Sequence, residues 1–225
     1  MTEVVDASGV APGEVLVDVK GVKVHFPIKR GLLIDRTVGH VYAVDGMDLT
    51  IRRGETYGLV GESGCGKSTF GRALLQLEEL TEGSVTLGGV DRATLKGEDL
   101  RRQRRHMQMV FQDPLGSLDP RQTVEQLLLE GMQAHGLASD KKGARDRLVE
   151  LLAAVGLPPG ALSKYPHEFS GGQRQRVGIA RALSVDPELI VADEPVSALA
   201  VSVQAQVINL LEDLQSECGL TYSVL

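Results

Sequence analysis

The residues with the clearest chemical potential lie in a glycine-rich segment, GESGCGKST, which spans positions 61–69. Glycines let consecutive backbone N–H groups curl around a phosphate, at the positive end of the helix that the next residues predict. Lys67 would supply a mobile cation to the β- and γ-phosphates of a nucleotide, and Ser68 would offer a hydroxyl to Mg²⁺. The segment predicts a nucleotide site formed by Gly61, Ser63, Gly64, Cys65, Gly66, Lys67, Ser68 and Thr69.

A second candidate group is the adjacent carboxylate pair Asp193 and Glu194, which ends the apolar run in ELIVADEP. The apolar residues predict a buried strand that delivers both carboxylates to its C-terminal edge. There Asp193 could hold Mg²⁺ through water, and Glu194 could polarise an attacking water molecule. Acidic residues often end strands, so it is the combination with the glycine-rich loop that points to phosphoryl hydrolysis.

A second glycine site lies in FSGGQRQR, at positions 169–176. The spacing of Ser170 and Gln173 is that of a capping box, so the two glycines between them begin a helix and offer N–H groups to an anion. Because the first loop already covers the β-phosphate of a bound nucleotide, we expect this segment to serve the nucleotide of another subunit. The residues concerned are Ser170, Gly171, Gly172 and Gln173.

Composition restricts the class of protein that can carry these groups. With 225 residues, 42% hydrophobic and 24% charged, the chain fits one globular domain. It has no apolar run near the roughly 18 residues of a membrane helix, and no signal-peptide pattern at its start, so we expect neither export nor membrane spanning. Two cysteines exclude a disulfide framework and indicate a reducing compartment. The net charge of −6 disfavours general polyanion binding, and RRQRR at 101–105 is expected to be a solvated or docking helix face.

The elements that would position these groups alternate between strand and helix patterns. Residues 15–26 predict two strands or one bulged strand, residues 27–41 predict a surface loop, and ETYGLVG at 55–61 predicts a short buried strand. Strand patterns recur in SVTLGG, MQMVF, ELIVADE and LTYSVL. Helical patterns cover 123–155, opened by a capping-box spacing, then 170–183, then a last helix that stops at Gly219. We expect one α/β domain over residues 1–225, with an inserted helical subdomain at about 115–168.

Four motifs, in the order GESGCGKST, FQDP, FSGGQ and LIVADEP, resemble those of the ATP-binding subunits of ABC transporters, over residues 15–225. The resemblance implies a P-loop NTPase fold with an antiparallel β subdomain and an inserted helical subdomain, with ATP and Mg²⁺ as cofactors. It implies that Gln112 senses Mg²⁺ and the attacking water, with Glu194 as its catalytic partner. It also implies a head-to-tail dimer, and an aromatic residue stacked on adenine, for which Phe26 is the first choice and Tyr42 the alternative.

The sequences that flank these motifs, including FQDPLGSLDPR and HFPIKRGLL, resemble those of the oligopeptide/dipeptide importer branch. That branch implies a transport ATPase that powers peptide import, although nickel and glutathione importers share the same flanking sequences. The implied partners are a second ATP-binding subunit, paralogous or identical, two membrane permease subunits and, indirectly, an external substrate-binding protein, with no nucleic acid. The implied location is peripheral, at the cytoplasmic face of the cell membrane.

Two departures from the family pattern bear on activity. SALA at 197–200 replaces SALD, so Ala200 lacks the carboxylate that helps to couple the two sites of the dimer. A histidine that contacts the γ-phosphate in the family would fall about two residues past Leu225, so we expect a truncated chain with low ATPase activity. The alternatives are a catalytically impaired nucleotide-binding module of the same lineage, or an ABC-type ATPase that acts on DNA. The DNA-acting proteins of the family carry long insertions between the phosphate loop and the second glycine site, and this chain has no such insertion between 61–69 and 169–176.

Overall fold

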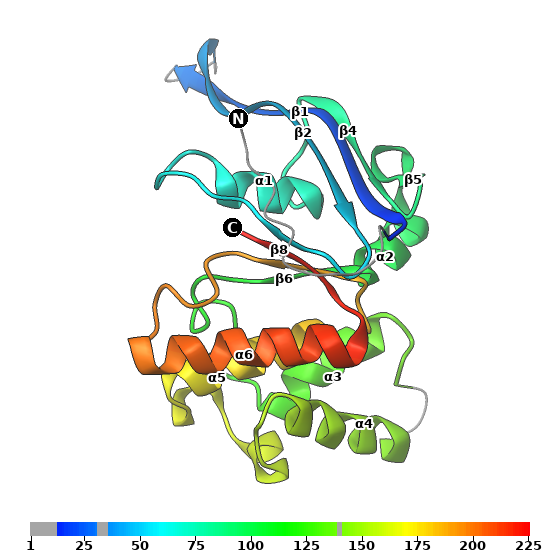
Figure 1. Cartoon of the computed structure of the whole chain (residues 1–225), viewed down its shortest axis with the longest axis vertical. Coiled ribbons are helices and arrows are strands. Elements are labelled where there is room, and N and C mark those ends of the chain that lie inside the picture. The colour runs from blue at the N-terminus through cyan, green and yellow to red at the C-terminus, as the bar shows by residue number, and fades with distance from the viewer. Residues whose placement is uncertain (1–12, 31–35, 139–140) are drawn as a thin grey trace.

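The structure is a computed structural model that describes residues 13–30, 36–138 and 141–225. Its first sheet is antiparallel, with strand order β2-β1-β4-β5, and lies uppermost in Figure 1. Its strands are β1 (Val15–Arg30), β2 (Arg36–Arg52), β4 (Glu82–Leu87) and β5 (Val90–Asp91). Its register shifts between Val19 and Val22, where Gly21 has a φ of 56°, so the bulged-strand alternative is confirmed.

The prediction of a surface loop over 27–41 is wrong for the described residues. Strand β1 continues to Arg30 and β2 begins at Arg36, with Ile28 paired to Gly39 and Lys29 to Thr37. This end of the two-stranded ribbon is exposed on both faces, so its sequence shows no alternation of apolar and polar residues. Backbone hydrogen bonds form the ladder without that alternation. Positions 31–35 lie outside the described residues.

The second sheet is parallel, with strand order β3-β8-β7-β6. Its strands are β3 (Thr56–Gly58), β8 (Thr221–Val224), β7 (Leu189–Ala192) and β6 (Met107–Val110). The sequence predicts a buried strand over 55–61, but β3 covers three residues and is partly exposed. The reason is its position: within the described sheet β3 has one neighbour, β8, and its other edge is open.

Six helices of the described chain surround the sheets, together with three short 3₁₀ turns. The helices are α1 (Lys67–Leu74), α2 (Gly97–Arg105), α3 (Val124–Ala134), α4 (Lys141–Ala154), α5 (Gly171–Leu183) and α6 (Val201–Cys218). The turns are η1 (Arg92–Thr94), η2 (Pro159–Ser163) and η3 (Pro166–Glu168). The helical pattern over 123–155 divides into α3 and α4, because α3 ends near Gly136, whose φ is 70°. None of the described helices is long and apolar enough to span a membrane.

The helix ends follow the capping signals. Both predicted capping boxes are confirmed, with reciprocal bonds between Thr123 and Gln126 and between Ser170 and Gln173. Helix α6 ends at Gly219, which adopts the left-handed conformation with a φ of 64°.

Two hydrophobic cores hold the layers together. One fills the space between the antiparallel sheet, α1 and one face of the parallel sheet, and the other lies between the opposite face and the helices α3 to α6 (Figure 1). Strand β7 contributes Leu189 and Val191 to the first core and Ile190 to the second. Burial on both faces explains its unbroken apolar sequence and fixes the strand that precedes Asp193.

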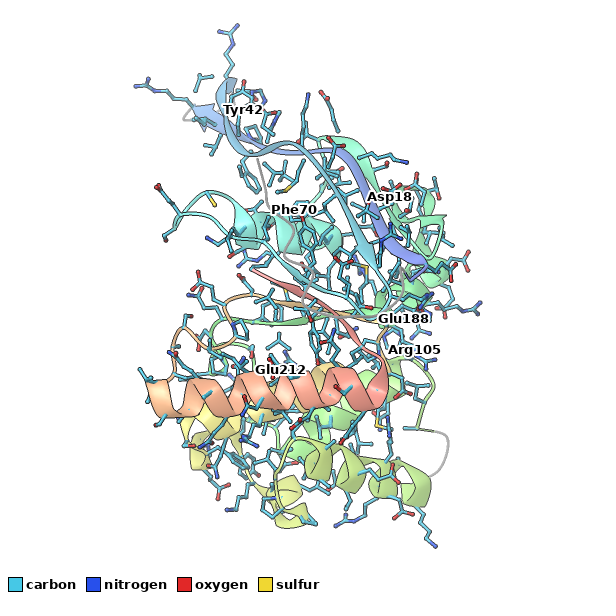
Figure 2. All side chains as sticks on the ribbon, viewed as in Figure 1. Asp18, Tyr42, Phe70, Arg105, Glu188 and Glu212 are labelled. Carbon is cyan, nitrogen blue, oxygen red and sulfur yellow. The ribbon has the colours of Figure 1, made fainter. Side chains whose placement is uncertain are left out.

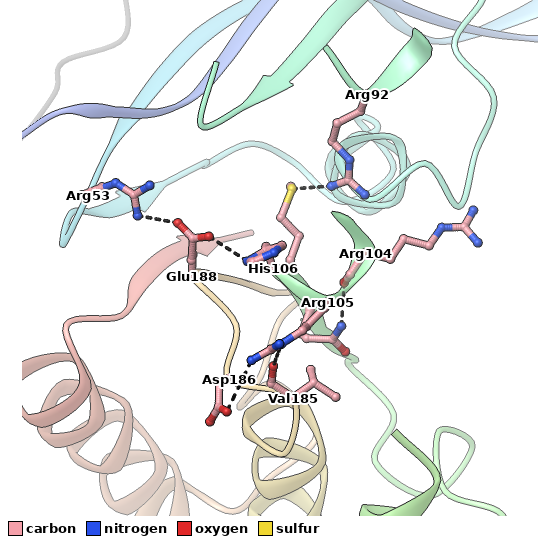
Figure 3. A network of polar contacts seen from close by, with 10 residues as sticks. Arg53, Arg92, Arg104, Arg105, His106, Val185, Asp186 and Glu188 are labelled. Carbon is pink, nitrogen blue, oxygen red and sulfur yellow. Dashed lines mark hydrogen bonds and ion pairs between the residues drawn. The ribbon is translucent and has the colours of Figure 1, made fainter. Parts of the chain in front are cut away.

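The basic cluster on α2 docks within the domain. Arg101, Arg104 and Arg105 donate to the backbone carbonyls of Ala134, Gln76 and Val185, respectively. Figure 3 shows the neighbouring ion pairs of Asp186 with Arg105 and of Glu188 with Arg53 and His106. Asp186 also pairs with Arg147. Of the two predicted roles, solvated or docking face, the structure shows docking for these three arginines.

Candidate active site

The glycine-rich loop connects β3 to α1 and adopts a conformation that requires glycine. Gly66 caps α1 with a φ of 98°, and a Cβ atom there would lie 2.0 Å from the carbonyl oxygen of Ala43. Gly64 also has a positive φ, of 82°. The Lys67 ammonium folds back over the loop and donates to the carbonyls of Gly61 at 2.8 Å and Glu62 at 3.0 Å. A lysine held by loop carbonyls can exchange them for phosphate oxygens without moving its backbone.

A cavity of about 620 Å³ lies between this loop and strand β2. The loop contributes Cys65, Gly66 and Lys67 to its lining. The aromatic residues of the lining are Tyr42, which is 64% exposed, and Phe70 (Figure 2). Phe26, the first choice for stacking on adenine, lies outside this lining. The cavity therefore favours the alternative aromatic, and the choice between the two stays a prediction.

Two acidic residues on β2, Asp45 and Asp48, also line this cavity and were not found by sequence reasoning. Asp45 accepts from the His25 ring at 2.9 Å, and Asp48 accepts from the backbone N–H of Gly21 at 2.7 Å. Nothing in their spacing to the phosphate loop indicates this placement, which arises because β2 crosses directly over Gly66.

The acidic pair lies at the C-terminal end of β7, as predicted. Asp193 is 3% exposed and accepts a hydrogen bond of 2.8 Å from the Ser68 hydroxyl. Mg²⁺ prefers oxygen ligands of this kind. Among the described residues no group of three or more His, Cys, Asp or Glu side chains could hold a metal ion. A cation at this position would thus depend on Ser68, Asp193 and the phosphates of a nucleotide, which is how Mg²⁺ is commonly bound.

Gln112 and Glu194 are in direct contact. The Gln112 amide, just after β6, donates from Nε2 to Glu194 Oε2 at 2.7 Å. Glu194 has a φ of 43°, an uncommon conformation for a residue with a side chain that is frequently found at functional sites. Gln112 and Asp193 also line a cavity of about 520 Å³ with Arg72. The structure thus brings four predicted residues to one edge of the parallel sheet: Ser68 at the start of α1, Gln112 after β6, and Asp193 with Glu194 after β7.

The second glycine site stands apart from this group. Ser170 caps α5, and its side chain accepts from the Gln173 backbone at 3.4 Å. Gly172 lies against α6, since a Cβ atom there would be 2.4 Å from Val203 Cγ1. Among the described residues no hydrogen bond joins 170–173 to the phosphate loop, and the cavity beside the loop does not include them. The two glycine sites of one chain do not form a single site.

The comparisons with known proteins agree with this geometry. The family model described as "ABC transporter" matches residues 44–197. The chain belongs to the ABC transporter family. It is 53% identical to the oligopeptide transport ATP-binding protein AppF of Bacillus subtilis, over 93% of this chain and 63% of that protein. It is 48% identical to the oligopeptide transport ATP-binding protein OppF of Salmonella typhimurium, over 92% of this chain and 63% of that protein.

A solved relative has the same fold. The dimeric ATP-binding cassette MJ0796 bound to ADP and Pi is 31% identical, with a TM-score of 0.79 over 93% of this chain and 87% of that one. The predicted α/β fold of a P-loop NTPase with an antiparallel sheet is therefore confirmed, and family membership implies nucleotide binding. The chain spans 63%, 61% and 66% of the length of three curated relatives from Bacillus subtilis.

Proposed function

We propose that this chain binds ATP with Mg²⁺ and hydrolyses it to power the import of di- or oligopeptides through an ABC transporter. The observation that carries the proposal is a pair of hydrogen bonds at one edge of the parallel sheet, from the Ser68 hydroxyl to Asp193 and from the Gln112 amide to Glu194. The names of the relatives support peptides as the cargo. They do not favour the DNA-acting alternative.

The side chains divide the work between binding and water activation. Lys67 would leave the loop carbonyls to neutralise the β- and γ-phosphates, and the loop N–H groups would hold the β-phosphate. When bound by Ser68 and Asp193, Mg²⁺ would offset the charge that develops on the transferred phosphoryl group. Glu194 would accept a hydrogen bond from the attacking water in place of the one it now accepts from Gln112. The Gln112 amide would then orient that water.

The second glycine site supports a dimer as the working unit. Ser170, Gly171 and Gln173 are exposed at a helix N-terminus and are separate from the chain's own phosphate loop. We infer that, together with Gly172, they contact the nucleotide bound by a second ATP-binding subunit, paralogous or identical. The solved relative MJ0796 is dimeric, which supports this arrangement.

The same reasoning extends to the wider assembly. We propose two membrane permease subunits as direct partners, an external substrate-binding protein as an indirect one, and a peripheral position at the cytoplasmic face of the membrane. The segment 115–168, which includes α3 and α4, is proposed to be the inserted helical subdomain. Ala200, at the start of α6, is proposed to weaken coupling between the two sites of the dimer.

The test is transport by the assembled complex in proteoliposomes, with ATP and a labelled oligopeptide. Glu194→Gln should retain ATP binding while ATP hydrolysis and peptide uptake fall together by about 100-fold or more, because a general base contributes roughly that factor. Ser163→Ala, on the surface turn η2, serves as the matched control and should transport normally. Uptake that continues at the wild-type rate in Glu194→Gln would refute the proposal.

A further inference from the structure

Ser197 occupies a position between the two residues of the hydrolytic pair. Its hydroxyl Oγ donates to the backbone carbonyl of Glu194 at 3.1 Å. The same oxygen accepts from Gln112 Nε2 at 3.4 Å, so one hydroxyl bonds both to the Glu194 backbone and to the Gln112 side chain. A serine hydroxyl has one proton to donate and lone pairs to accept with, so both bonds can exist at once.

Ser197 binds the backbone of Glu194, which has an unusual left-handed conformation. The N–H of Ser197 also donates to the Glu194 carbonyl, at 3.2 Å, so a tight turn closes just after the residue with a φ of 43°. A residue other than glycine keeps that left-handed backbone conformation only where the surrounding structure holds it there. Two donors from Ser197 to one carbonyl provide such support.

The Gln112 amide is held from two sides. Its Nε2 donates to Glu194 Oε2 at 2.7 Å and, more weakly, to Ser197 Oγ. Both Gln112 and Ser197 are exposed, so burial does not restrict the glutamine side chain. The hydroxyl would therefore limit the positions that the Gln112 amide can adopt once Glu194 accepts a hydrogen bond from water in place of the one from Gln112.

We propose that Ser197 is a positioning residue for hydrolysis: its hydroxyl, anchored on the Glu194 carbonyl, holds the Gln112 amide in line with the attacking water, while the Ser197 N–H, which Ser197→Ala retains, holds the Glu194 backbone. This inference rests on the proposed function. Among the described residues no hydrogen bond joins Ser197 to the phosphate loop, and Ser197 lies outside the lining of the cavity beside that loop. Its removal should therefore slow the chemical step and leave ATP affinity unchanged.

The test is a double-mutant cycle measured as ATP turnover by the assembled complex. Ser197→Ala should lower kcat about tenfold with KM for ATP unchanged, and Ser197→Thr, which keeps a hydroxyl, should recover most of the loss. In the Gln112→Ala background, Ser197→Ala should change kcat by less than about twofold, because the amide that it positions is gone. Ser163→Ala is the matched control, since Ser163 makes the same local bond, to the Gly160 carbonyl at 3.2 Å, and no hydrogen bond joins it to a glutamine within the described residues.

Three outcomes are distinguishable. If Glu194→Gln abolishes turnover while Ser197→Ala changes nothing, the role of Ser197 is wrong and the proposed function stands. If Ser197→Ala lowers kcat equally with and without Gln112, the serine acts only on the fold, and the inference is overturned. If Glu194→Gln itself has no effect on turnover, the proposed function fails first.

Discussion

Arg92 is a fully buried arginine whose replacement by an apolar residue should stabilise the protein. Its side chain is 0% exposed beneath the C-terminal end of α1. Nη1 donates to the Leu74 carbonyl at 3.4 Å and contacts Met107 Sδ (Figure 3). Nε and Nη2 find no partner within the described part of the chain. A charge is therefore held out of water with most of its donors unsatisfied.

The size of the effect follows from the pKa of this guanidinium. Burial, followed by the charge of Arg104, lowers the pKa of Arg92 to about 10. One pKa unit corresponds to about 1.4 kcal/mol, so a fall from the ordinary value near 12.5 indicates an unfavourable term of about 3 kcal/mol. The folded state binds this proton less tightly, so the penalty is fully present at neutral pH and is relieved only above about pH 10. Part of the gain is lost to the gap that a shorter side chain leaves.

The assay is thermal and urea unfolding of Arg92→Met and Arg92→Leu beside wild type. Removing the charge should raise the free energy of unfolding by about 1 to 3 kcal/mol and raise Tm by several degrees. Arg102→Leu is the matched control: its side chain is 72% exposed and pairs with Glu98 at 3.5 Å, so its change should be close to zero. If both Arg92 variants melt below wild type, the arginine is satisfied after all and the reasoning is refuted.

Three further predictions concern other parts of the structure. Gly66→Ala should abolish ATP binding, measured by equilibrium dialysis, because the new Cβ atom would collide with the Ala43 carbonyl; binding at the wild-type affinity would contradict the loop geometry. Thr123→Ala should lower the free energy of unfolding in urea by about 1 kcal/mol through loss of the cap bond to Gln126, and an unchanged midpoint would count against that bond. The pKa of His135 is lowered, mainly by burial and to a smaller extent by the charges of nearby arginines. The unfolded chain therefore binds this proton more readily than the folded one. Stability should then fall as pH drops through 6.5, less steeply in His135→Gln, and parallel pH curves would exclude this contribution.

The chemistry of the candidate site could be read largely from the sequence, because its motifs place specific residue types at fixed spacing. The loop at 61–69 requires glycines, a lysine and a hydroxyl, and the strand before Asp193 is apolar on both faces. Such local requirements leave a signature in the order of residues. The capping boxes at Thr123 and Ser170 were predictable for the same reason.

What depends on distant pairing could not be read in this way. The long ribbon of β1 and β2 is exposed at its end and shows no periodicity, so its residues resemble a loop. Which aromatic reaches the cavity depends on the register that pairs Phe26 with Val41 and His25 with Tyr42. The contact between Gln112 and Ser197 joins residues 85 positions apart. The segment SALA departs from the family pattern at Ala200, and nothing in it indicates a role for Ser197.

The central claim, that the loop at 61–69 binds ATP through Lys67, is tested most directly by ATP-binding isotherms of the chain. Lys67→Ala should weaken ATP affinity by about 10- to 100-fold, because each charge-assisted bond to a phosphate contributes about 1.5 to 3 kcal/mol. Lys96→Ala, which removes an exposed lysine at the start of α2, should bind ATP as wild type does. Equal ATP affinity in wild type and Lys67→Ala would contradict the account.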